Sequence, residues 1–78
     1  MGARTTRARL PRSGVDALTV REGQVATLVT RGMTNRQIAG RLLVTEKTVE
    51  MHLSHTFVKL GVGNRAALVR EMLLTDKE

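Results

Sequence analysis

The side chains with the clearest binding chemistry lie between positions 47 and 54, on one face of a predicted helix. Lys47 can bind a guanine edge or a phosphate, and Glu50 can accept a hydrogen bond from the amino group of cytosine. Met51 can contact the methyl group of thymine, and Ser54 can hydrogen bond to a base edge or to the DNA backbone. We therefore expect these four side chains to contact bases in a DNA major groove. The alternative for each of them is a solvated helix face.

Phosphate contacts are expected from polar residues at the starts of two consecutive predicted helices. A helix start presents unpaired backbone N–H groups and the positive end of the helix dipole, and both favour an anion. Thr34 and Arg36 lie at the start of one such helix, where the alternative role of Thr34 is that of a cap alone. Thr45 and Thr48 lie at the start of the next, and His55, further along it, is either a phosphate contact or a surface residue.

The two histidines do not form a metal-binding pattern. His52 and His55 are three residues apart, but no convincing third ligand accompanies them and the HExxH zinc pattern is absent from the sequence. The chain has no cysteine, which excludes disulfides and cysteine-based zinc sites. We expect no metal, no cofactor and no small-molecule ligand in this domain, so helix packing alone must stabilise it.

Two capped segments with a very short connection predict a helix-turn-helix. Thr34 and Thr45 are eleven residues apart, and each precedes a segment with apolar residues at helical spacing. The predicted helices cover 35–42 and 46–60. In such a motif the second helix lies in the DNA major groove, while the first crosses the backbone. The core-facing stripe of the second helix is expected to comprise Val49, Leu53, Phe57 and Leu60.

Two further helices are expected to flank this motif. Thr19 and Glu22 match a capping box, and Gly32 supplies a left-handed stop, which together predict a helix over 20–31. Periodic apolar residues predict a fourth helix over 65–74. The predicted fold is all-α: a compact four-helix bundle that contains a helix-turn-helix.

Composition favours a binding module over an enzyme. The chain has 78 residues, enough for one small domain, which leaves little apolar surface to shape a substrate pocket. Lys and Arg exceed Asp and Glu by 13 to 7, and this net charge of +6 favours a polyanionic partner. Phe57 is the one aromatic residue, so duplex DNA fits better than single-stranded nucleic acid stacked on aromatic rings.

No apolar run is long enough to span a bilayer, and we expect a cytoplasmic protein without membrane contact.

The chain divides into three predicted regions. Residues 1–17 are basic and lack apolar periodicity, so we expect a flexible linker, or an arm that touches DNA phosphates or a minor groove. Residues 18–74 form the DNA-binding domain, and residues 75–78 form a disordered tail.

Apolar residues on the fourth predicted helix exceed what a short scaffold helix needs. Part of this surface is expected to pair with a second copy of the chain, because two-fold operators require symmetric dimers. The alternative is that Leu68 and Met72 only close the core. The residues predicted for dimerisation are Val69, Met72 and Leu73.

Four sequence blocks resemble the consensus of LuxR-type C-terminal DNA-binding domains, and the match covers about Ala17 to Met72. The resemblance implies the end of a bacterial transcription regulator that dimerises through its fourth helix and is often joined to an upstream receiver, ligand-sensing or ATP-binding domain. By position, it places family base readers on the four residues from Lys47 to Ser54 and phosphate contacts on Thr45 and Thr48. The blocks are Leu18-Thr19-x-Arg21-Glu22, Gly32-Met33-Thr34-Asn35-Arg36-Gln37-Ile38-Ala39, Thr45-x-x-Thr48-Val49-x-x-His52 and Lys59-Leu60-Gly61-Val62-x-x-Arg65.

The sequence departs from this family pattern at three positions of the third helix. Family members often have Lys or Arg where Glu50 and Val58 stand, and Ile where Thr56 stands. Two other functions stay open at this point. One is a sigma-factor-like promoter-recognition module, although the fourth helix argues against it. The other is a helical protein-interaction module whose basic charge is incidental. RNA polymerase is a candidate partner of a DNA-bound regulator.

Overall fold

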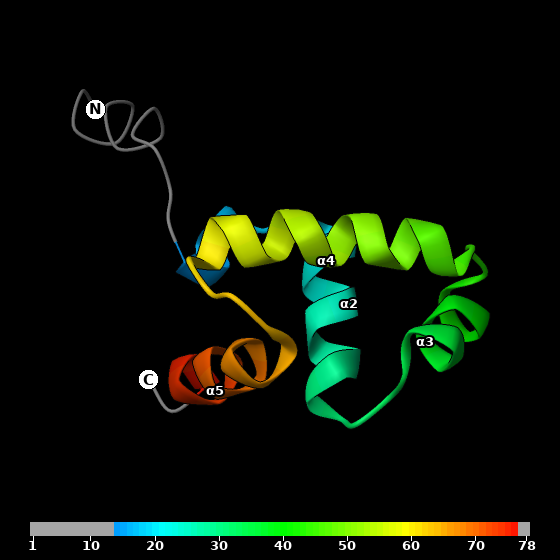
Figure 1. Ribbon diagram of the computed structural model, residues 1–78. Helices are drawn as coiled ribbons and strands as arrows, with labels where there is room; N and C mark the ends of the chain where they lie inside the picture. Colours follow the sequence, from blue (N-terminus) through cyan, green and yellow to red (C-terminus); the bar gives the residue numbers. More distant parts are fainter. Residues whose placement is uncertain (1–13, 77–78) are drawn as a thin grey trace, which may run out of the picture.

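A computed structural model of the chain describes residues 14–76, which contain five helical elements and no strand (Figure 1). The prediction of an all-α fold is confirmed. A turn of three residues joins the third and fourth elements into the expected helix-turn-helix. In chain order the elements are a 3-10 helix, η1 (Gly14–Ala17), followed by α2 (Val20–Thr30), α3 (Asn35–Leu42), α4 (Glu46–Leu60) and α5 (Arg65–Asp76).

The bounds of α3 and α4 are those predicted, whereas α2 and α5 differ at their C-terminal ends. α2 ends at Thr30 rather than at Arg31, because the Arg31 N–H donates to carbonyls of the preceding turn in a tightened geometry. α5 continues to Asp76, so the prediction of a disordered tail over 75–78 is wrong for its first two residues. The Thr75 hydroxyl donates to a carbonyl one turn back at 3.0 Å and supports this extension.

The predicted linker over 1–17 ends in a structured turn. Gly14–Ala17 form η1, which packs against α4, and the Leu18 N–H donates to the Val15 carbonyl at 3.1 Å. The linker prediction is therefore wrong for residues 14–17, and Leu18, the first residue of the predicted domain, packs against the core. The remaining part of the predicted linker and the end of the predicted tail, residues 1–13 and 77–78, lie outside the described residues.

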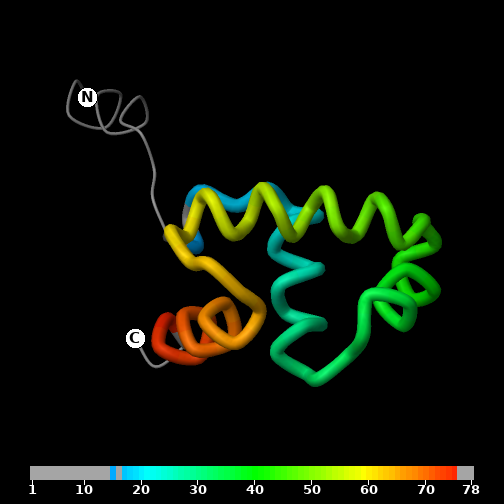
Figure 2. Tube along the Cα trace, viewed as in Figure 1, coloured from blue at the N-terminus to red at the C-terminus, as the bar shows by residue number. Residues whose placement is uncertain are grey.

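The other three α-helices are arranged around α2. Figures 1 and 2 show α4 lying across one end of α2, with α3 and α5 on opposite sides of it. η1 and the end of α5, which are the two ends of the described chain, lie on the side away from the start of α4 (Figure 2). Within residues 14–76, none of the helices combines the length and the apolar character needed to cross a lipid bilayer.

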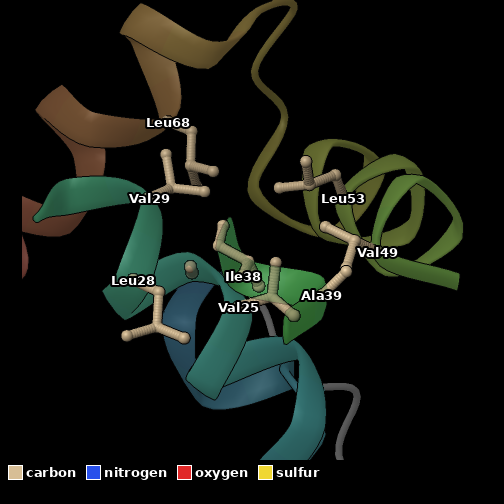
Figure 3. Packing of buried hydrophobic residues seen from close by; sticks show 9 residues of the cluster. Val25, Leu28, Val29, Ile38, Ala39, Val49, Leu53 and Leu68 are labelled. Atoms are coloured by element: carbon tan, nitrogen blue, oxygen red, sulfur yellow. The ribbon is translucent and has the colours of Figure 1, made fainter. Parts of the chain in front are cut away.

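Side chains from all four α-helices form one hydrophobic core. Val25 of α2, Ile38 of α3 and Val49 of α4 are fully buried and converge at its centre, while Leu68 of α5 packs near α2 (Figure 3). The remaining buried apolar residues are Ala26, Leu28, Val29, Ala39 and Leu53. Ala39 brings α3 close to its neighbours, because its side chain is small. This core fixes α4 relative to the other helices.

The stripe of α4 that faces the core differs slightly from the prediction. Val49 and Leu53 are buried as expected, whereas Phe57 and Leu60 are partly buried at the edge of the core. Thr56 is fully buried, and its hydroxyl donates to the carbonyl of His52 at 2.7 Å. A polar residue is tolerated at this buried position because its hydrogen bond is satisfied within the helix.

Two reciprocal capping boxes start α2 and α3, as the sequence predicts. The Thr19 hydroxyl accepts from the Glu22 N–H at 3.1 Å, and the Glu22 carboxylate accepts from the Thr19 N–H at 3.0 Å. The Thr34 hydroxyl accepts from the Gln37 N–H at 3.1 Å, and the Gln37 side-chain oxygen accepts from the Thr34 N–H at 2.9 Å. Each box satisfies two backbone donors that the helix itself leaves unpaired.

The turn between α3 and α4 contains a backbone conformation that the sequence did not indicate. Leu43 has φ 60° and ψ 44°, and it is the one residue other than glycine with a positive φ in the described chain. Gly32 and Gly61 also have positive φ and follow α2 and α4, and Gly32 is the stop predicted after α2. The Leu43 side chain is 89% exposed, so packing does not compensate its left-handed backbone.

Replacing Leu43 with glycine is expected to stabilise the domain. The left-handed conformation costs about 1–2 kcal/mol for an L-residue with a Cβ atom, whereas glycine adds about 0.5–1 kcal/mol of unfolded-state entropy. Urea denaturation of Leu43→Gly should therefore show a gain of up to about 1 kcal/mol. Leu42→Gly is the matched control, since Leu42 is helical and partly buried, and it should lose stability. A loss for Leu43→Gly would contradict the assignment of strain.

Candidate nucleic-acid interface

The four predicted base-contacting side chains lie together on the exposed face of α4. Lys47, Glu50, Met51 and Ser54 are all exposed, and they line one shallow depression with the threonines at the helix start. The core-facing stripe of α4 lies on the other side of the helix. The structure therefore brings six of the predicted contact residues into one surface, the α4 depression: Thr45, Lys47, Thr48, Glu50, Met51 and Ser54.

The side-chain hydroxyls of Thr45 and Thr48, at the start of α4, are hydrogen bonded to each other. Thr45 is the N-cap, and its oxygen accepts from the Thr48 N–H at 3.1 Å. The Thr45 hydroxyl also donates to the Thr48 hydroxyl oxygen at 3.0 Å. The hydroxyl proton of Thr48 can therefore point outward to an acceptor such as a phosphate oxygen.

Charged groups in the α4 depression are available to a partner. Both ion pairs within residues 14–76 involve Glu22, and neither involves Lys47 or Glu50. The Lys47 ammonium can approach a guanine edge or a phosphate, and the Glu50 carboxylate can accept only from a donor such as the cytosine amino group. The negative charge of the Glu50 carboxylate disfavours close approach of a phosphate.

The start of α3 forms a second polar surface, outside the α4 depression. Thr34 and Arg36 are exposed there, as predicted for phosphate contacts. The Thr34 oxygen accepts from the Gln37 N–H, which leaves its hydroxyl proton for an outside acceptor. The first turn of α3 has no acidic residue, so its dipole and the Arg36 guanidinium both favour an anion.

His55 lies beside a buried carboxylate rather than in the α4 depression. Its side chain is 57% exposed, and its Nδ1 atom is 3.7 Å from Glu22 Oε2. The other histidine, His52, is partly buried and uses its carbonyl in the bond to Thr56. Among the side chains described for residues 14–76, no group of three potential ligands is placed to hold a metal ion.

An ion pair between a buried carboxylate and a partly exposed lysine joins α2 to α4, and no pattern in the sequence had indicated it. The Glu22 side chain is 4% exposed, and its Oε1 atom is 2.7 Å from Lys59 Nζ. The same carboxylate accepts from the Thr19 N–H in the capping box. Burial raises the pKa of Glu22, but hydrogen bonds from Lys59 and Thr19 and the nearby charges of Lys59 and His55 lower that pKa below its usual value.

Acid is expected to destabilise the domain through Glu22. Its pKa is lower in the folded chain than in the unfolded chain, where it is about 4.3. The stabilisation is therefore fully present above the unfolded pKa and is lost as the pH falls through the folded pKa. Between pH 6 and pH 3 the Tm of Glu22→Gln, measured by thermal unfolding, should fall less than the Tm of the parent chain. Glu50→Gln, at an exposed position on α4, should retain the parent's pH profile, and equal profiles for all three chains would contradict the assignment.

The predicted dimerisation residues on α5 have different exposures. Val69 and Met72 are partly buried against the chain's own core, whereas Leu73 is 51% exposed. Leu68 is fully buried and closes the core, which matches the alternative considered for that residue. Pairing of two copies through α5 stays a prediction, and Leu73 is its most accessible component.

The fold and the polar face of α4 define the chain as a helix-turn-helix domain. Residues 16–72 match the family described as bacterial regulatory proteins, luxR family, and the chain belongs to this family. The resemblance inferred from the sequence is thereby confirmed. The family and its named members establish DNA binding in transcription regulation as the function of the domain.

Individual relatives share the domain at very different total lengths. The chain is 44% identical over 61 residues to an HTH-type transcriptional regulator of Mycobacterium bovis, covering 78% of this chain and 7% of that protein. It is 43% identical over 56 residues to the spore germination protein GerE of Bacillus subtilis, covering 72% of this chain and 76% of that protein. Among solved structures, the response regulator ChrA of a heme-sensing two-component system superimposes with a TM-score of 0.75 at 36% identity, covering 96% of this chain and 36% of that chain.

Proposed function

We propose that the chain binds specific sequences of duplex DNA by placing α4 in the major groove. The observation that carries this proposal is the α4 depression, where four side chains suited to base edges share one exposed face. The opposite face of the helix is anchored in the core, so these side chains approach DNA from a rigid support. Thr34, Arg36, Thr45, Thr48 and His55 are the proposed phosphate contacts.

We also propose that two copies bind together on a two-fold operator. The support for pairing is the apolar surface of α5, where Leu73 is exposed beside the partly buried Val69 and Met72. A symmetric dimer of this kind would place its half-sites about one helical turn apart. As a DNA-binding regulator it would act in the bacterial cytoplasm, and RNA polymerase is its candidate protein partner.

Selection of bound duplexes from a random pool tests both proposals. The expected result is a palindromic consensus whose half-sites are separated by about 10 base pairs. A consensus with a single half-site would contradict the proposed dimer but not the proposed base contacts by α4. Recovery of duplexes without any consensus would contradict sequence-specific binding.

Salt dependence separates phosphate contacts from other modes of binding. For the selected duplex, log K should fall linearly with log salt by about 0.9 for each neutralised phosphate. A helical protein-interaction module would show no such slope on DNA.

A further inference from the structure

Within α5 alone, the position of Arg65 is electrostatically unfavourable for a cation. It is the first residue of α5, where the positive end of the helix dipole disfavours a cation. The cap of this helix is supplied by Asn64, whose side-chain oxygen accepts from the Ala67 N–H at 2.8 Å. The first turn of α5 has no acidic residue that could compensate the guanidinium. The hydrogen-bond partners of the Arg65 guanidinium lie instead in another part of the fold.

The Arg65 guanidinium binds the residues on both sides of the α3 cap. Its Nη1 atom donates to Asn35 Oδ1 at 2.8 Å, and its Nη2 atom donates to the carbonyl of Met33. These two acceptors flank Thr34 in the sequence. Because a guanidinium is planar and donates in a fixed fork, two bonds define the orientation of this turn better than a lysine could.

The turn held by Arg65 belongs to the second polar surface of the proposed interface. Thr34 and Arg36 are exposed there and are proposed to contact phosphate. The Arg65 side chain is only partly buried, and its two bonds leave further N–H donors on the guanidinium. A turn that is already fixed before DNA arrives loses less conformational entropy on binding.

We propose that Arg65 is a positioning residue for DNA binding: it fixes the start of α3 so that Thr34 and Arg36 meet the DNA backbone. The proposal rests on the DNA interface proposed above. It adds a residue of α5, outside the helix-turn-helix, to the machinery that orients the motif on phosphate. Arg65 acts through the start of α3, and its own charge is used in the bonds to Met33 and Asn35.

A double-mutant cycle tests this role on the selected duplex at fixed salt. In the parent chain, Arg36→Ala should weaken binding by about tenfold, as expected for a lost hydrogen bond to a charged group. In the Arg65→Ala background the same change should cost at most about threefold, because the start of α3 is no longer fixed. Equal costs in both backgrounds would overturn the proposal. So would a drop of about 0.9 in the salt slope of Arg65→Ala that is independent of Arg36, since this would indicate direct phosphate binding by Arg65.

The conservative variant and a matched control separate geometry from charge. Arg65→Lys keeps the cation but loses the fork, so it should bind DNA as weakly as Arg65→Ala, and full affinity for Arg65→Lys would overturn the proposed geometry. Arg70→Ala removes the same charge from an exposed position on α5 and should leave the effect of Arg36→Ala unchanged.

Folding and the proposed interface are checked independently. Circular dichroism and urea denaturation establish that each variant is folded at the binding temperature. If Arg65→Ala does not fold, Asn35→Ala takes its place in the cycle, since it removes one acceptor and keeps the cation, and the same coupling to Arg36 is expected. Lys47→Met is measured on the same duplex. If Lys47→Met does not change DNA affinity, the proposed DNA interface is contradicted. If Lys47→Met weakens DNA binding but the effects of the Arg36 and Arg65 changes are additive, only the proposed role of Arg65 is contradicted.

Discussion

Replacing Lys59 with methionine is expected to lower the free energy of unfolding by about 1.5–3 kcal/mol at pH 7, the range for a hydrogen bond to a charged group. The change removes the ammonium 2.7 Å from the Glu22 carboxylate and leaves that carboxylate buried with less compensation. Methionine retains most of the aliphatic length of lysine and a high helix propensity, so the loss reports mainly on the charge. Urea denaturation monitored by circular dichroism provides the measurement.

Two controls make this result specific to the ion pair. Lys47→Met makes the same replacement at an exposed position of the same helix and should change stability by less than about 0.5 kcal/mol. The double variant Glu22→Gln with Lys59→Met should recover part of the loss, because an uncompensated buried charge is no longer present. Equal losses for the two lysine variants would show that the bond between Glu22 and Lys59 does not stabilise the fold.

Lys47→Met is expected to weaken binding to the selected duplex by about 10- to 100-fold, which corresponds to about 1–3 kcal/mol for a lost contact to a base edge. Fluorescence anisotropy at one fixed salt concentration measures this change. If Lys47 reads guanine, the variant should also lose its preference at one base pair of the consensus. If Lys47 binds only phosphate, affinity should fall uniformly across sequences, and the salt slope should decrease by about 0.9.

The matched control for Lys47→Met is Arg31→Met. Arg31 is exposed at the end of α2 and lines no part of the α4 depression, so its removal changes net charge by the same amount without touching the proposed interface. Arg31→Met should retain nearly full affinity and the parent's sequence preference. If both variants weakened binding equally, net charge rather than a contact by Lys47 would account for the effect.

Local sequence signals predicted most of the fold. Thr19, Thr34 and Thr45 cap the helices at which they were placed, and Gly32 adopts the left-handed conformation of the predicted stop. Each of these signals depends on residues within one turn of one another, where spacing in the sequence determines spacing in the structure. The grouping of the α4 depression was predictable for the same reason, since its residues lie on one face of a single helix.

Features that depend on tertiary contacts could not be predicted in this way. The bonds of Glu22 to Lys59 and of Arg65 to Asn35 join residues 37 and 30 positions apart, and no periodic pattern encodes such pairs. The left-handed Leu43 was missed because leucine carries no preference for that conformation. The structured turn of η1 was missed because its stability comes from packing against α4 and not from apolar periodicity within the segment.

The placement of η1 and the end of α5 away from the start of α4 has an architectural consequence (Figure 2). Chain that continues beyond η1 or α5 would leave the described domain on the side away from the start of α4, where Thr45, Lys47 and Thr48 are proposed to meet DNA. This arrangement is compatible with fusion to other domains. The matching region makes up 76% of GerE but only 7% of the mycobacterial regulator.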